Sequence, residues 1–160
     1  MSNGQVTIYR ERLWPAPWLF ISTALVIPAS LLVFLPINQL AGVIVAIVLY
    51  LGCVTLLLLG SPAIAVTDSE FVAGKARLPL GLVGTVAGYS GTDARDQRGP
   101  RLDARAWLLI RGWVDPVVTV EVVDADDPTP YWVVSTRHPE AIIDAVARAK
   151  ASAPARAGND

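Results

Sequence analysis

The sequence predicts a membrane α-helical hairpin joined to a mainly-β domain that ends in a single helix. Three observations predict this fold class. First, the chain has no Asp, Glu, Lys, Arg or His from Leu13 to Thr67, a run of 55 residues. Second, short runs of β-branched and aromatic residues, separated by turn residues, occupy the chain from Ala63 to Thr136. Third, an apolar stripe of helical period follows Pro139.

The charge-free run is too apolar for the core of a soluble protein. A soluble domain of this size carries about 25% charged residues, whereas this chain has 17%. A soluble helix keeps one wet face, but a charge at mid-bilayer costs about 2.5–3.5 kcal/mol. We therefore expect an integral membrane protein. A cleaved signal peptide over residues 1–30 fits less well, because no A-x-A site follows and a second apolar stretch comes directly after.

The run, within residues 13–62, is long enough for two spans. A helix needs about 20 residues to cross the hydrocarbon core, and we place the spans at about 15–35 and 40–59. The turn at 36–39 contains proline and two side-chain amides, which favour an interface over lipid. Pro15 suits a first helical turn, and Pro28 should kink the first span.

Aromatic and small residues suggest how the spans are held. Trp14 and Trp18 are typical of the aromatic belt at a membrane interface, with core aromatics as the alternative. Gly42 and Ala46 are four residues apart, a spacing that lets two helices approach closely. Their face would pack on the first span, contact another copy of the chain, or have no partner.

Basic residues around the hairpin predict its orientation. Arg10 and Arg12 precede the first span, Lys75 and Arg77 follow the second, and the turn between them has no basic residue. The positive-inside rule then puts both termini in the cytoplasm. We expect a multi-pass protein of the cell (plasma) membrane whose residues 1–12 form a cytoplasmic N-terminal segment.

Residues 63–150 are predicted to form a cytoplasmic β domain. Closely spaced strands with Gly-, Pro- and Asp-rich turns favour an antiparallel sandwich or partly open barrel, with residues 91–103 as a loop. Alternation puts Val118, Val120 and Val122 on one face, with Thr119 and Glu121 on the other. The expected strands are Ala63–Thr67, Glu70–Ala76, Val83–Ser90, Ala104–Arg111, Val117–Val123 and Tyr131–Thr136.

One helix closes the chain. Pro139 suits its first turn, and its apolar stripe can cap an open end of the sheet. The residues of the stripe are Ile142, Val146 and Ala149. Residues 151–160 read as a disordered tail.

Several strands followed by one helix resemble the bacterial pleckstrin-homology-like fold. The resemblance rests on the first hairpin, AIAVTDSEFVAG, and on the strand-to-helix passage YWVVSTRHPEAIIDAV. With two spans in front, Val6 to Lys150 resembles an uncharacterised family of small, alanine-rich, two-span actinobacterial membrane proteins of unknown function. The resemblance implies architecture and supplies no catalytic residues. Lipid-binding eukaryotic domains of this fold use a basic first hairpin loop, whereas Asp68-Ser69-Glu70 is acidic here.

The sequence offers no constellation for metal binding or catalysis. His138 is the only histidine and lies just before a helix start, and Cys53 is the only cysteine. The acidic turn at 124–130 lacks the glycine and the final glutamate of a calcium loop. We expect no catalytic, metal or cofactor-binding residue, and the net charge of −1 gives no reason to expect nucleic-acid binding.

Arginine and tryptophan residues after residue 90 are the candidate contact residues for a partner or a membrane surface. Basic groups near the cytoplasmic leaflet attract anionic headgroups, although interleaved aspartates favour a solvated loop. A structural Arg111–Asp115 pair among core tryptophans is the alternative for the segment 105–116. The candidate residues are Arg98, Arg101, Arg105, Arg111 and Trp113.

These features predict a non-enzymatic, membrane-tethered interaction or scaffold module. Its partners would be the lipid bilayer and a protein of unknown identity, and a homo-oligomer remains open. The alternatives are an accessory subunit of a transporter or other membrane complex, and a module that senses anionic lipid. An enzyme fits least, because the titratable groups show no converging arrangement.

Overall fold

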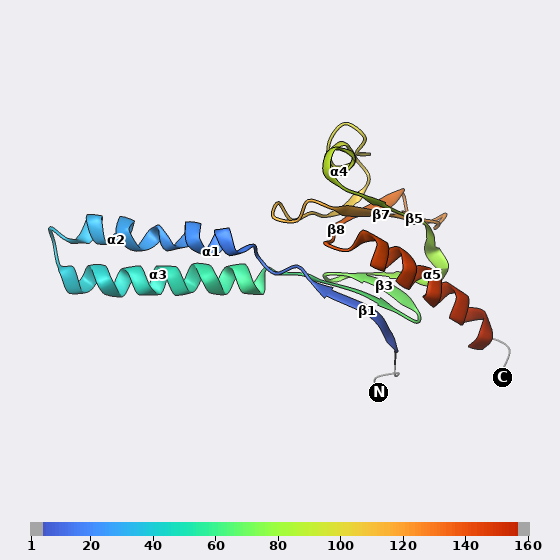
Figure 1. Ribbon diagram of the computed structural model, residues 1–160, viewed down its shortest axis with the longest axis horizontal. Helices are drawn as coiled ribbons and strands as arrows, with labels where there is room; N and C mark the ends of the chain where they lie inside the picture. Colours follow the sequence, from blue (N-terminus) through green and yellow to red (C-terminus); the bar gives the residue numbers. More distant parts are fainter. Residues whose placement is uncertain (1–4, 157–160) are drawn as a thin grey trace. The chain divides into compact units, whose positions relative to one another are not determined.

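The chain before the two apolar helices folds together with the chain after them. The computed structural model describes residues 5–156, and the chain forms two compact units. One unit is the segment Trp14–Ser61, and the other combines the chain before it with the chain from Pro62 onward. The predicted helix pair and β domain are both present, and the helix pair is an insertion into the β domain (Figure 1).

The inserted unit is a pair of apolar helices. Its first arm consists of α1 (Pro17–Ala24) and α2 (Val26–Phe34), and its second arm is α3 (Gln39–Leu59). Both arms are long and apolar enough to cross a membrane, and few of their residues are buried. The first arm is interrupted at Leu25 because Pro28, three residues later, has no N–H to continue the helical bonds. Pro17, rather than the predicted Pro15, takes the first helical position.

The two arms meet at a capped turn. Asn38, predicted as part of the turn, is the N-cap of α3, and its Oδ1 accepts from the amides of Leu40 (2.9 Å) and Ala41 (3.2 Å). The turn therefore ends one residue earlier than predicted. Gly42 is buried against α2, where an added Cβ would lie 3.0 Å from Cβ of Phe34.

A strand that the sequence analysis did not assign begins the β domain. β1 (Thr7–Arg12) pairs antiparallel with β2 (Ala63–Thr67), and the Leu13 amide donates to the Pro62 carbonyl at 2.9 Å. The described residues of the N-terminal segment predicted at 1–12 therefore belong to the same unit as the domain predicted at 63–150, which corrects their separation. The pairing joins residues more than 50 positions apart, which local patterning does not reveal.

The first sheet has the order β1-β2-β3-β4. The predicted strand at 70–76 is in fact two strands, β3 (Glu70–Ala73) and β4 (Ala76–Pro79). Gly74 adopts φ +62° in the turn between them, a conformation that glycine takes without strain.

The second sheet has the order β5-β7-β8-β6 and follows the short 3-10 helix η1 (Leu80–Leu82). β6 pairs parallel with β8 and is only three residues long, which corrects the wholly antiparallel arrangement and the longer strand at 104–111. A helix, α4 (Gly91–Arg98), occupies the first part of the loop predicted at 91–103, and the rest is irregular. The strands of this sheet are β5 (Val83–Tyr89), β6 (Trp107–Leu109), β7 (Val117–Val122) and β8 (Tyr131–Ser135).

The C-terminal helix α5 (Pro139–Arg156) is longer than predicted. The helix runs on through residues 151–156, so the predicted disordered tail is corrected over this stretch. Residues 157–160 lie outside the described part of the chain. The predicted stripe of Ile142, Val146 and Ala149 is confirmed as buried.

Both sheets and α5 contribute side chains to one hydrophobic core. Phe71 comes from the first sheet, Val118 and Trp132 from the second, and Ile142 from the helix. The Phe71 and Trp132 ring centroids are 6.2 Å apart, and burial of each such side chain contributes about 1.5–3 kcal/mol. The predicted inward face of β7 is confirmed, since Val118, Val120 and Val122 are all buried.

A carboxylate ties β1 to the beginning of α5. Glu11 accepts hydrogen bonds from the Thr136 hydroxyl (2.5 Å), the Arg137 amide (3.0 Å) and the Tyr9 hydroxyl (3.1 Å). Burial and the neighbouring Glu11 charge raise the pKa of Tyr9 to about 12. Because Thr136 also accepts from the His138 amide, the N-terminal strand helps to fix the start of the helix.

Candidate functional site

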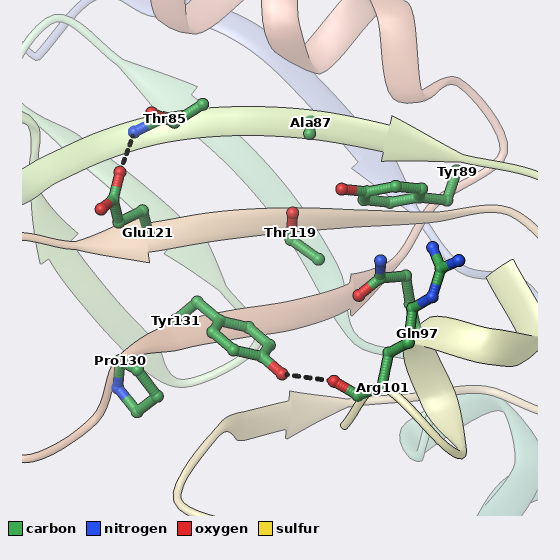
Figure 2. A pocket seen from close by; sticks show the side chains of 9 residues that line it. All are labelled: Thr85, Ala87, Tyr89, Gln97, Arg101, Thr119, Glu121, Pro130 and Tyr131. Atoms are coloured by element: carbon green, nitrogen blue, oxygen red, sulfur yellow. Dashed lines mark hydrogen bonds between the residues drawn. The ribbon is translucent and has the colours of Figure 1, made fainter. Parts of the chain in front are cut away.

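An open groove lies on the outer face of the second sheet, away from the core (Figure 2). Its volume is about 480 Å³, within the roughly 300–1,000 Å³ typical of ligand sites. All of its lining belongs to the β domain: Thr85, Ala87, Tyr89, Gln97, Arg101, Thr119, Glu121, Pro130 and Tyr131.

Strand alternation builds the floor of the groove. Thr85, Ala87 and Tyr89 are every second residue of β5, and Thr119 and Glu121 are the outward residues of β7. Ala87 lies opposite Thr119 in the register. Because the floor side chains at its centre are small, the surface between the two tyrosines is left open (Figure 2).

Helix α4 forms one wall and is held by its own contacts. Ala94 is fully buried and packs against Val117 of β7 and Val133 of β8. Asp115 accepts from the Gly91 amide at 2.8 Å and from Arg98 Nη2 at 3.1 Å. The Gly91 hydrogen bond, followed by that from Arg98, lowers the pKa of Asp115 below its usual value.

Tyr131 fixes the segment after α4. Its hydroxyl accepts from the Asp103 amide at 2.8 Å and donates to the Arg101 carbonyl at 3.2 Å (Figure 2). The ring therefore forms part of the lining while its polar end orders the backbone that carries Arg101. These bonds make the groove largely pre-formed.

Glu121 of β7 stands at one end of the groove, beside an irregular stretch of β5. The register shifts between Val83 and Val86, and the Thr85 amide donates to Glu121 Oε2 at 2.8 Å. That backbone bond, with a smaller contribution from the Lys150 charge, lowers the pKa of Glu121. An added Cβ at Gly84 would lie 2.5 Å from Oε2 of Glu121 and 2.7 Å from Cγ2 of Val123, so these side chains would have to shift to accommodate it.

Several polar groups of the groove remain available for a ligand. Among residues 5–156, no hydrogen bond is formed by the side chains of Tyr89, Gln97 or Thr119. Arg101 forms no ion pair within the same range. Figure 2 shows Arg101 and Glu121 at opposite ends of the groove. The site therefore presents a negative end, a positive end and uncharged donors and acceptors between them.

The predicted contact residues do not converge on one surface. Only Arg101 lines the groove, and Arg98 supports the α4 wall through Asp115. Arg98 therefore forms the ion pair with Asp115 that the sequence analysis considered for Arg111. The guanidinium carbon of Arg111 lies 6.0 Å from the centre of the Trp113 ring.

Arg105 forms an ion pair with its near neighbour Asp103 at 3.1 Å. In the separate helix pair, the predicted interfacial anchors Trp14 and Trp18 are 50% and 57% exposed, while Gly42 and Ala46 are buried.

The sequence analysis missed most of the groove residues. Thr119 and Glu121 were placed on the face opposite the buried valines, and this alternation was the available signal. Tyr89, Gln97 and Tyr131 gave no such signal, because α4 and the register bring them together.

The titratable residues considered for metal binding stay apart. Within the described part of the chain, no three His, Cys, Asp or Glu side chains form a group that could hold a metal ion. In the acidic turn, Asp124 accepts from the Asp126 amide at 3.0 Å and Asp127 from the Thr129 amide at 2.8 Å. These two carboxylates therefore stabilise the turn itself.

Sequence comparison assigns the chain to a family. The family described as protein of unknown function (DUF3093) matches residues 8–146, from β1 into α5. The chain belongs to DUF3093. The matched residues run from within β1, through the inserted helix pair and both sheets, to within α5. No curated protein and no solved structure matches the chain significantly.

Proposed function

We propose that this protein is a non-enzymatic, membrane-anchored interaction module. In this proposal the inserted helix pair spans the cell membrane as a hairpin, and the groove of the β domain binds a partner protein on the cytoplasmic side. The observation that carries the proposal is a pre-formed polar groove on a domain whose chain is interrupted by two membrane-length apolar helices.

The position of the insertion supports the membrane topology. The two arms leave the β domain from neighbouring strands, where the Leu13 amide bonds the Pro62 carbonyl. A domain joined to both ends of a hairpin lies on a single side of the bilayer. Arg10 and Arg12 on β1 then favour the cytoplasmic side for that domain and for both termini.

The order of the elements supports a pleckstrin-homology-like fold for the β domain. Two four-stranded sheets share one core with a C-terminal helix. If the strands are assigned to this fold in chain order, the first hairpin is β1–β2, and its loop is the entire insertion Trp14–Ser61. The turn at Asp68-Ser69, which the sequence analysis took as the first hairpin loop, joins β2 to β3. The parallel strand β6 and helix α4 are additions to this plan.

The charged groups of the groove are suited to holding a partner. The lowered pKa of Glu121 keeps it ionised near neutral pH, whereas a general base works best with a pKa near the working pH. Arg101 lies at the other end and offers a fixed positive charge. A lipid-sensing role has less support, because Arg98 and Arg105 are already paired with Asp115 and Asp103.

Crosslinking in native membranes tests the proposal. The full chain is compared with the hairpin segment Trp14–Ser61 alone and with two substituted chains. Thr119→Trp fills the centre of the groove, and Ala125→Trp, on the exposed turn, is the matched control. We expect a partner that the full chain and Ala125→Trp capture and that Thr119→Trp loses.

Two outcomes would contradict the proposal. If no protein is enriched over the hairpin segment, the module does not recruit a partner. If the hairpin segment captures the same stoichiometric partner, the protein acts as an accessory subunit through its helices.

A further inference from the structure

We infer that the groove binds an extended peptide segment that carries a cationic and an anionic group about four residues apart. The inference rests on the proposed function and names the class of ligand for the same site. It follows from the charges, the length and the unpaired polar groups of the groove.

The two charged ends set the polarity of the ligand. Glu121 is exposed, and its bond from the Thr85 amide holds the carboxylate in place. Arg101 is exposed at the other end, beside Gln97 and Tyr89 (Figure 2). A ligand with a cationic group at one end and an anionic group at the other complements both.

The length of the floor selects a peptide over a compact zwitterion. From Thr85 to Tyr89 the floor follows β5 for four residue steps, which is about 13 Å at roughly 3.3 Å per residue. An amino acid or a phosphoethanolamine headgroup carries its two charges much closer together and reaches one end only. An extended peptide with charged side chains at positions i and i+4 covers the same distance.

The groups between the ends match a peptide backbone. Tyr89, Gln97 and Thr119 supply hydroxyl and amide groups that no residue within 5–156 engages. Peptide N–H and C=O groups require such partners when they leave water. Pro130 and the Tyr131 ring add apolar surface for one side chain.

Affinity selection from peptide pools tests the inference with the full chain in phosphatidylcholine nanodiscs. The pools are end-capped Lys-x-x-x-Glu, Gln-x-x-x-Glu, Lys-x-x-x-Gln and the adjacent isomer Lys-Glu-x-x-x. We expect Lys-x-x-x-Glu to be enriched about threefold to fivefold over the adjacent isomer, as exposed ion pairs allow. Enrichment is read by mass spectrometry.

Two charge-neutral variants assign each end of the ligand. Glu121→Gln, which keeps an oxygen for the Thr85 amide, should abolish the preference for Lys over Gln and keep the preference for Glu. Arg101→Gln, which keeps the backbone carbonyl bound by Tyr131, should do the reverse. Glu70→Gln on the first sheet is the control and should change neither preference.

Equal enrichment of the spaced and adjacent pools would overturn the inference, as would either variant abolishing both preferences together. If Thr119→Trp still blocks capture of a protein partner in that case, the proposed function stands and only the ligand class is wrong.

Discussion

Replacing Glu11 with alanine should weaken the attachment of β1 to the start of α5. The carboxylate bonds the hydroxyl of Thr136, whose side chain is fully buried, and the amide of Arg137. A hydrogen bond to a charged group contributes about 1.5–3 kcal/mol, and the exposed amide can regain water, so we expect a loss of about 2–4 kcal/mol. For a domain of this size, that loss lowers Tm by about 8–16 °C.

The measurement is thermal unfolding of the full chain in nanodiscs, followed by near-ultraviolet circular dichroism. Amide hydrogen exchange over residues 7–12 should accelerate in Glu11→Ala, because β1 loses its attachment to α5. Glu70→Ala removes a carboxylate from the same sheet whose partner, Arg77, is largely exposed, and it should lower Tm by less than about 4 °C. Equal Tm changes for Glu11→Ala and Glu70→Ala would refute the reasoning that β1 is locked by Glu11.

Three further predictions concern the insertion, the helix pair and the groove wall. Replacing Trp14–Ser61 with an Asn-Gly turn should give a folded, water-soluble domain, since β1 and β2 already meet at the junction; aggregation during gel filtration would contradict this. Gly42→Val should destabilise the helix pair by about 1–3 kcal/mol in detergent titration, whereas Gly52→Val, with open space around it, should not; equal effects would count against close packing at Gly42. In the folded protein the hydrogen bond from the Gly91 amide, followed by that from Arg98, lowers the pKa of Asp115 below its ordinary 3.8. The ionised carboxylate therefore stabilises the fold above about pH 3.8, and this stabilisation is lost as the pH falls through the folded pKa. Urea unfolding should therefore show the wild type and Asp115→Asn converging below about pH 4, and a constant difference down to pH 2 would rule this out.

Local patterning predicted most of the elements well. The charge-free run fixed both apolar arms to within a few residues, because the exclusion of charge is a property of every residue along the run. Period-two alternation identified the inward face of β7, and the apolar stripe identified the buried face of α5. In each case the burial pattern repeats with the geometry of the element itself.

Features that depend on distant pairing escaped prediction. β1 is a strand because β2 lies beside it, although the two are separated by the whole insertion. The strand β6 is parallel to β8 because the chain reaches it after α4 and the Tyr131-anchored segment. Arg98 was predicted as a contact residue, yet Asp115 engages it and makes it a support of the groove wall.

The sequence by itself determined that two membrane-length helices accompany a β domain with one closing helix, since hydropathy and periodicity are local quantities. The tertiary structure alone decided that the helices interrupt the β domain and that Tyr89, Gln97, Arg101, Glu121 and Tyr131 line one groove. The physical reason is that strand register and helix packing set which distant side chains share a surface, and register is fixed only when the core of both sheets assembles.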